Sequence, residues 1–421
     1  MRSAHELRYL FLDLNAYFAS VEQQENPRLI GRPVAVVPIA GTDTTCAIAA
    51  SYEAKRYGVK TGTRIREARQ LCPTLVTVPA RHDLYVEYHR RIMAEIENHL
   101  PIHRVMSIDE AACRLLGAEC EPAQAMRLGR AIKDGIRKNV GDALRASVGI
   151  APSVLTAKIA ADLQKPDGLV VLQASELPQR LLHLQLTDLP GIGFNMAERL
   201  ARAGVHDVAA LWALTPKQTR AIWGSVVGER FWYALRGADL PDIVTGRHSI
   251  GHSRVLSPDM RPPPRARFVA RALLLKAAVR LRRYGVAAGA LGLSVRSVRH
   301  GRFAQETDFL PTQDSFVLLA HLDKLWRSFT AAAGAREPLL KTSIWLFRLE
   351  PIETRMPDLF AERFAPGGFS RGEALWRAVD KLGERYGRNM VTLASQQNLS
   401  LQYLGAKIAF TRVPDPVEFR E

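Results

Sequence analysis

The sequence contains few cysteines, which limits the folds and metal sites that it can form. Only four occur among 421 residues, and no two of them stand in a CxxC arrangement. A disulfide-rich secreted scaffold and a zinc ribbon are therefore excluded, because both need cysteines paired at close spacing. We expect reduced thiols in a cytoplasmic protein.

Long apolar runs are also missing. Although 47% of the residues are hydrophobic, no apolar stretch approaches the roughly 18 to 20 residues that a membrane-spanning helix needs. The amino terminus lacks the charged and then apolar layout of a signal peptide. We expect no membrane partner, and a chain of this length should bury the cores of about two to four domains.

Acidic residues are scarce relative to basic ones. The sequence has 42 Asp and Glu against 58 Lys and Arg, a net charge of +16. Residues 247–350 alone hold 18 Lys and Arg against 7 Asp and Glu, which leaves +11. Such an excess favours a polyanionic partner. It predicts that residues 247–350 grip a nucleic-acid backbone.

Three of the acids stand in apolar surroundings. Asp13 lies within the apolar run 9–18, and the adjacent pair Asp109 and Glu110 follows a second apolar run. Neighbouring carboxylates raise each other's pKa, so a buried cluster needs a cation. Without a His or Cys ligand set, the candidate is a pair of Mg²⁺ ions in an oxygen-only site suited to phosphoryl transfer. The alternative is a solvated turn with ordinary surface acids.

The position of the acid pair constrains the local fold. Consecutive residues of a regular strand point to opposite faces, so Asp109 and Glu110 cannot both reach one point from mid-strand. We therefore expect the acidic strand at 105–110 to end or kink there, or to form a hairpin turn.

Three further residues are candidates for binding phosphate. Tyr52 and Lys55 lie on a predicted helical turn, and Lys158 falls in the predominantly apolar segment 148–160. A lysine in such a segment needs an anionic partner, and a triphosphate would supply one. The alternative for each residue is an ordinary surface position.

Two features have both a structural and a functional interpretation. Gly191 and Gly193 precede a helical segment, as in a helix-hairpin-helix, whose backbone N–H groups bind DNA phosphates without reading sequence. Alternatively, they only form a tight turn. Phe18 could be the wall beneath a sugar ring, or simply a core aromatic residue.

The remaining patterns predict an ordered set of elements. Residues 181–240 read as helices with short loops, and residues 247–350 follow a βαββαβ order. The expected helices are 84–100, 266–284, 314–332 and 372–386, and the expected strands are 34–38, 45–50, 250–256, 290–298, 303–310 and 341–349.

Five segments, taken in order, resemble the Y-family translesion DNA polymerases of the DinB/UmuC type, and the resemblance covers nearly the whole chain. They are Leu12–Phe18, Ser51–Lys55, Ser107–Ala111, Ala157–Asp162 with Lys165–Gly168, and Pro190–Gly193. Five motifs in the right order are far more specific than any one of them.

The resemblance implies a multidomain α/β fold, with an α+β palm and fingers, a helix-hairpin-helix thumb and an α+β little finger. On this basis we expect four parts. They are the palm with inserted fingers (1–168, fingers about 26–80), the thumb (169–242), the little finger (247–350) and a C-terminal extension (351–421).

The resemblance also implies an activity and a set of site residues. Asp13, Asp109 and Glu110, with the carbonyl of Leu14, would hold two Mg²⁺ ions. The residues implied to contact the incoming dNTP are Tyr52, Lys55 and Lys158 as the triphosphate grip and Phe18 as the gate against ribonucleotides. The reaction would be low-fidelity, template-directed transfer of a nucleotide to a primer 3′-OH, with release of pyrophosphate, in DNA damage tolerance.

Several positions depart from the family pattern. Ala49 stands where a hydroxyl residue usually contacts phosphate, and Lys55 replaces an Arg, trading a bidentate fork for a point charge. Asn15 replaces a frequent second Asp, Arg104 a common Glu, and Ala112–Arg114 the usual aromatic-Leu-Asp.

These departures keep an alternative function open, namely a catalytically silent, polymerase-like DNA-binding scaffold that recruits another polymerase. A nuclease or glycosylase would explain the helix-hairpin-helix but not the segments around Tyr52 and Lys158.

The expected partners are primer-template DNA, dNTP and a sliding clamp, for a monomer acting at the bacterial nucleoid. Residues 355–360 resemble a clamp-docking motif without its leading Gln, with Leu359 and Phe360 as the contacts. The alternative is a linker with two apolar residues.

Overall fold

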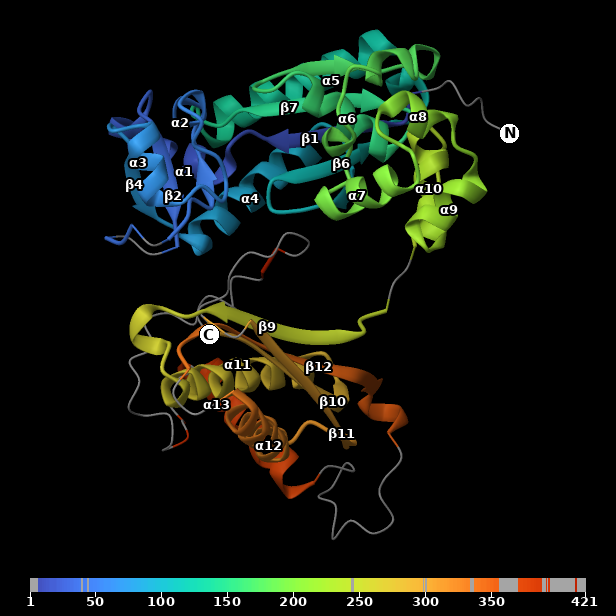
Figure 1. Cartoon of the computed structure of the whole chain (residues 1–421). Helices are drawn as coiled ribbons and strands as arrows, with labels where there is room; N and C mark the ends of the chain where they lie inside the picture. The colour runs from blue at the N-terminus through green and yellow to red at the C-terminus, as the bar shows by residue number, and fades with distance from the viewer. Residues whose placement is uncertain are drawn as a thin grey trace. The chain divides into compact units, whose positions relative to one another are not determined.

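The computed structural model of the chain forms two compact units, which are described separately (Figure 1). Unit 1 comprises Met1–Asp242 and Ala406–Phe419, and unit 2 comprises Ile243–Gly405 and Arg420–Glu421. Leu359 and Phe360 lie outside the described residues, so their predicted role stays a prediction. The structure describes residues 7–38, 41–43, 45–243, 246–297, 299, 301–333, 337–355, 370–387, 391, 393 and 413–414.

Unit 1 is built on a five-stranded sheet in the order β5-β6-β1-β7-β8. The central strand β1 pairs antiparallel with both β6 and β7, and β8 runs parallel to β7. The strands are β1 (Tyr9–Leu14), β5 (Ile102–Val105), β6 (Glu110–Arg114), β7 (Ala146–Ala151) and β8 (Leu169–Val171).

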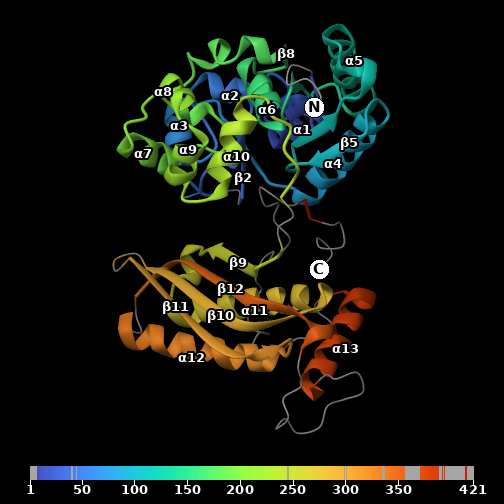
Figure 2. The same ribbon diagram turned by 90° about the vertical axis from the view of Figure 1, so that its right-hand side faces the viewer.

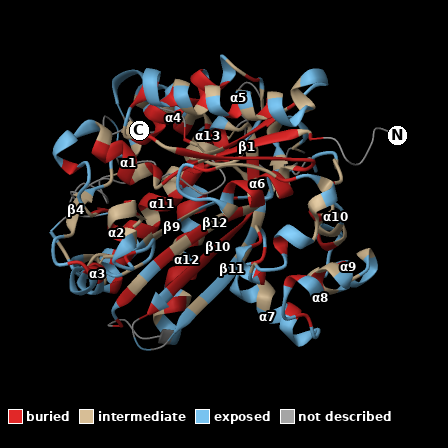
Figure 3. Cartoon of the chain, turned by 90° about the horizontal axis from the view of Figure 1, so that it is seen from above, coloured by how far each residue is buried: buried red, intermediate tan, exposed pale blue. Residues whose placement is uncertain are grey.

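Alternation along β1 divides its side chains between two cores. Leu10, Leu12 and Leu14 pack with α4 (His82–Glu97) and α5 (Pro122–Gly135). Tyr9 and Phe11 pack on the other face with α6 (Val154–Leu163) and the thumb helices. Nearly every residue of β1 is buried, as the red ribbon in Figure 3 shows. Because alternate residues share a face, Asp13 lies on the same side as Phe11.

The predicted hairpin at the acid pair is confirmed. Strand β5 ends at Val105, residues 107–109 form bends, and β6 begins at Glu110. The extent predicted for the acidic strand, 105–110, is wrong, because the chain turns within it to pair β5 with β6. The turn brings Asp109 and Glu110 to one end of the sheet.

The segment predicted as fingers contains a small sheet in the order β3-β2-β4, and helix α1 precedes it. The strand predicted at 45–50 is present only at its end, because Ala47 N–H donates to Thr63 O in a neighbouring turn rather than to a strand. The elements are α1 (Tyr17–Glu25), β2 (Val34–Val37), β3 (Ala49–Ala50), α2 (Tyr52–Arg56), α3 (Ile65–Leu71) and β4 (Val76–Pro79).

The thumb segment is helical, as predicted. Gly191 has a φ of +92°, a conformation that costs glycine least, just before the first thumb helix. At the far end of the thumb, Tyr9 Oη donates to Asp239 Oδ1 (2.6 Å) and so ties the thumb to β1. The helices are α7 (Phe194–Arg202), α8 (Val208–Ala213), α9 (Pro216–Trp223) and α10 (Val226–Leu235).

Unit 2 has the predicted βαββαβ order and a sheet in the order β11-β10-β12-β9. Its two long helices cover one face of the sheet and share one core with it (Figure 2). The elements are β9 (Ser249–Val255), α11 (Pro263–Arg283), β10 (Val286–Ser297), β11 (Arg302–Thr312), α12 (Ser315–Ala333) and β12 (Leu339–Pro351).

A further helix, α13 (Arg371–Tyr386), belongs to unit 2 and agrees with the helix predicted at 372–386. Arg282 donates to both Asp380 oxygens (2.5 and 2.9 Å), and its side chain is only 4% exposed. Buried Glu373 accepts from Arg355 (2.6 Å) and from the N–H of Gln313 (2.8 Å). These ion pairs attach α13 to the rest of unit 2.

None of the helices in the described part of the chain is long and apolar enough to cross a membrane.

Replacing Asp380 should destabilise unit 2. Asp380→Ala leaves the Arg282 guanidinium buried without its carboxylate, which we expect to cost about 3 kcal/mol. Native-state hydrogen exchange of the α11 amides measures this loss. Glu384→Ala on the exposed side of the same helix is the control and should change stability by less than about 0.5 kcal/mol. Equal effects of the two substitutions would contradict a stabilising role for the ion pair.

Candidate active site

The three predicted acids meet where β1 and β6 lie side by side. Asp13 and Glu110 are opposite each other in the antiparallel register. The N–H of Leu14 donates to Asp109 O (2.8 Å), which fixes the turn against the end of β1. The structure therefore brings together residues almost a hundred positions apart, with Leu14 next to them.

Burial makes this cluster electrostatically costly. Burial raises the pKa of Asp13, Lys165 lowers it, and the neighbouring Asp109 and Glu110 raise it, so that it reaches about 6. Burial also raises the pKa of Asp109, against a hydrogen bond from Ser107 Oγ (2.5 Å). A cation among these carboxylates would reverse both shifts.

Two lysines now neutralise part of the cluster. Lys165 Nζ lies 2.7 Å from Asp13 Oδ2 and 2.7 Å from Asp162 Oδ1. Lys158 Nζ lies 2.5 Å from Glu110 Oε1. Among the described residues, no three His, Cys, Asp or Glu side chains form a group that could hold a metal ion as they stand. The donor set itself, carboxylates and carbonyls, fits a hard divalent cation.

Lys165 lies beside the acid cluster, and we did not single it out from the sequence as a candidate site residue. Although burial lowers its pKa, the carboxylates of Asp13 and Asp162 raise it well above the usual value. Its charge also lowers the pKa of both Tyr52 and Lys55, so it is close to the predicted phosphate grip as well as to the acids. The motif 165–168 was the signal that could have identified it.

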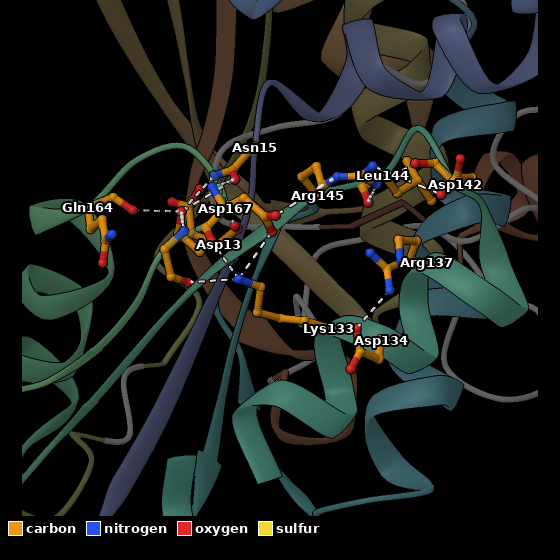
Figure 4. Close-up of polar contacts among 12 residues, drawn as sticks. Asp13, Asn15, Lys133, Asp134, Arg137, Asp142, Leu144, Arg145, Gln164 and Asp167 are labelled. Carbon is orange, nitrogen blue, oxygen red and sulfur yellow. Dashed lines mark hydrogen bonds and ion pairs between the residues drawn. The ribbon is translucent and has the colours of Figure 1, made fainter. Parts of the chain in front are cut away.

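The loop that carries Lys165 is held by Asn15 (Figure 4). Asn15 is 2% exposed; its Oδ1 accepts from the N–H of Asp167 (2.7 Å), and its Nδ2 donates to Ser147 Oγ (3.1 Å). Lys133 and Arg145 reach the Asp167 carboxylate from the opposite side, at 3.1 and 3.9 Å. Asn15, which departs from the family pattern, thus has a positional role here, because a backbone N–H needs an acceptor.

Tyr52 and Lys55 lie on α2 within reach of each other. Lys55 Nζ is 4.2 Å from the centre of the Tyr52 ring, a cation–π contact. Burial and the charge of Lys165 lower the pKa of Lys55, whereas burial raises that of Tyr52. Ser51 Oγ accepts from the N–H of Ala54 and caps the helix. The two side chains therefore form one polar surface beside the acids.

Phe18 is packed as an aromatic residue at the edge of the core. Its ring stacks on Tyr85, with centroids 4.2 Å apart and planes 11° apart, and meets the edge of His82. It is packed against the core of unit 1 but remains half-buried. Its role as a wall beneath a sugar ring stays a prediction.

Three further positions lie apart from the acids: Arg104 and Ala49, which depart from the family pattern, and Gly193, which agrees with it. Arg104 donates to Asp242 Oδ1 (2.7 Å) at the end of unit 1. Ala49 begins the short strand β3. Gly193 directly precedes α7, whose first residue, Phe194, is 80% exposed. None of these positions joins the carboxylate cluster.

Models of three protein-family domains match the chain in order. Residues 12–162 match the impB/mucB/samB family, residues 187–239 match the thumb domain of DNA polymerase-iota, and residues 247–359 match the C-terminal domain of the impB/mucB/samB family.

Relatives of similar length support the same assignment. The chain is 35% identical to DNA polymerase IV of Moorella thermoacetica, over 91% of this chain and 94% of the relative. It is 29% identical to DNA polymerase IV of Pelotomaculum thermopropionicum, with the same coverage. A solved Y-family DNA polymerase chimera superposes with a TM-score of 0.68 at 23% identity, over 82% of this chain and 99% of the chimera. The predicted fold class is confirmed.

Lys165 and Lys158 should each lower the pKa of a different aspartate. In protein without added metal, Lys165→Met should raise the pKa of Asp13 above about 6, because the positive charge that lowers this pKa most is removed. Lys158→Met should instead raise the pKa of Asp109. Carboxyl ¹³C NMR titration of Asp-labelled protein measures both, and each variant is the control for the other. An Asp13 pKa that does not change in Lys165→Met would contradict the pairing.

Proposed function

The chain belongs to the Y family of DNA polymerases, and from that premise we propose that it extends primers across damaged template bases at this carboxylate cluster. It is a DNA-directed DNA polymerase of the translesion type. The meeting of Asp13, Asp109 and Glu110 at the ends of β1 and β6 carries the proposal. Divalent metal binding suits this cluster, since burial leaves its carboxylates in need of positive charge.

In this proposal Asp13, Asp109 and Glu110 hold two Mg²⁺ ions, assisted by the carbonyl of Leu14. Bound Mg²⁺ supplies charge neutralisation and polarisation of the oxygens that react. The protein contributes fixed positions, since β1 and β6 are paired in register. The primer 3′-OH attacks the α-phosphate of the dNTP, and pyrophosphate leaves.

The lysines next to the acids have a second task. Lys158 and Lys165 form ion pairs with Glu110 and Asp13. When cations replace them at those carboxylates, both ammonium groups become available to phosphate oxygens. We therefore assign the triphosphate grip to Tyr52, Lys55 and Lys158, as the family resemblance implies, and add Lys165. The ammonium groups of Lys158 and Lys165 thus balance the charge of the acids before the substrate binds, and the charge of the triphosphate afterwards.

The remaining parts of the chain bind the DNA in this proposal. Gly191 and Gly193 open the thumb helix whose amino terminus would contact backbone phosphates. Unit 2 carries most of the excess positive charge and would hold the duplex. Leu359 and Phe360 would dock a monomer on a sliding clamp at the nucleoid. The match of residues 355–360 to a clamp-docking motif supports that assignment.

Removing the charges of Asp109 and Glu110 distinguishes an active polymerase from a catalytically silent scaffold. Asp109→Asn combined with Glu110→Gln keeps the side-chain volumes but removes both charges, so primer extension should fall roughly 10³-fold or more. Extension of a lesion-bearing template with Mg²⁺ and dNTPs measures the loss, and DNA binding reports on folding. Asp134→Asn, exposed on α5, is the control. A double variant that still protects a damage-sensitive strain would favour the silent scaffold instead.

The gate assigned to Phe18 has its own test. Phe18→Ala should raise incorporation of rNTP relative to dNTP by about tenfold or more, because a ribose 2′-OH would no longer meet the ring. Competitive incorporation with single nucleotides measures the ratio. Tyr17→Phe removes the hydroxyl that bonds Tyr85 O (2.6 Å) but leaves the wall intact, and should not change the ratio. An unchanged ratio in Phe18→Ala would assign the ring to packing alone.

A further inference from the structure

A buried histidine contacts the catalytic turn from behind. His89, on α4, is 5% exposed, and its Nδ1 lies 2.7 Å from the carbonyl oxygen of Ile108. Ile108 directly precedes Asp109, so this contact is one peptide away from a proposed metal ligand. His89 belongs to none of the motifs that the sequence offers, and the reaction outlined above makes no use of it.

The chemistry of the contact fixes the state of the ring. A carbonyl oxygen can only accept, so Nδ1 must carry the proton that it donates. Burial lowers the pKa of His89, which favours the neutral ring. The histidine therefore adds a directed hydrogen bond behind the acid cluster without adding charge to it.

The helix that carries His89 is firmly attached to α1. Tyr85 Oη donates to Glu22 (2.7 Å), Tyr88 Oη donates to Glu25 (2.7 Å), and Tyr17 Oη donates to Tyr85 O (2.6 Å). Residues 107–109, by contrast, form bends rather than regular strand. The hydrogen bond thus connects an irregular turn to a rigid support.

The surroundings of His89 are not uniformly packed. His89 is among the residues that line a cavity of about 270 Å³, together with Met93 of the same helix and with Val413 and Pro414 from the C-terminal segment. The hydrogen bond to Ile108 supplies a directional contact that apolar packing does not.

We propose that His89 is a positioning residue, which holds the Ile108–Asp109 peptide in place and so strengthens divalent-ion binding at Asp109. The proposal rests on the proposed function of Asp109 as a metal ligand. Partners behind a ligand typically change metal affinity or activity by about 10- to 100-fold. His89 acts through the backbone and not through contact with substrate.

Three variants separate the hydrogen bond from packing. His89→Ala removes the donor, and His89→Asn restores an N–H at the position of Nδ1. Met93→Ala, one turn further along α4 and also buried, removes volume beside the same cavity without touching the turn. Two measurements apply to the full-length chain: amide hydrogen exchange of residues 107–110 without metal, and the Mg²⁺ concentration for half-maximal primer extension.

We expect His89→Ala to exchange faster at residues 107–110 and to need about tenfold more Mg²⁺. His89→Asn should recover most of both, and Met93→Ala should change neither. Equal shifts in His89→Ala and Met93→Ala, or no recovery in His89→Asn, would overturn the proposal. If His89 only positions the turn, His89→Ala should reach full extension at saturating Mg²⁺. A failure of the proposed function would give a different result, because Asp109→Asn with Glu110→Gln would then remain active.

Discussion

Mutual repulsion among three buried carboxylates is the constraint on which the rest of unit 1 depends. Asp13, Asp109 and Glu110 are brought together by strand pairing, and burial raises the pKa of the first two. Lys158 and Lys165 offset that charge at distances of 2.5 and 2.7 Å. The geometry of the cluster therefore depends on a balance between the buried carboxylates and the ammonium groups beside them, a balance that divalent cations would take over in the proposed reaction.

The supports of the cluster come from residues that carry no charge of their own there. Asn15 and Ser147 hold the loop of Lys165 through its backbone, and His89 holds the turn of Asp109 in the same manner. Neutral hydrogen bonds suit this purpose, because they restrict geometry without altering an electrostatic balance that already includes several ions. Backbone attachment also leaves the acidic and basic side chains free to exchange partners.

The sequence predicted the features that follow from local periodicity or from several motifs in order. Strand alternation required a turn at Asp109 and Glu110, and the βαββαβ order of unit 2 followed from its apolar spacing. Lys165 escaped prediction because its position depends on a loop bonded to Asn15, about 150 residues away. His89 escaped for a similar reason, since a single buried histidine on an amphipathic helix looks like any other core residue.

The ion pair between Arg355 and Glu373 has a consequence for how the chain can vary. Arg355 directly precedes the 14 residues 356–369, and Glu373 lies in the first turn of α13, which follows them. The described residues on both sides of positions 356–369 are thus joined by one buried ion pair. A substitution at either charge would therefore loosen the end of β12 and the start of α13 together, although the two elements are separate in the sequence.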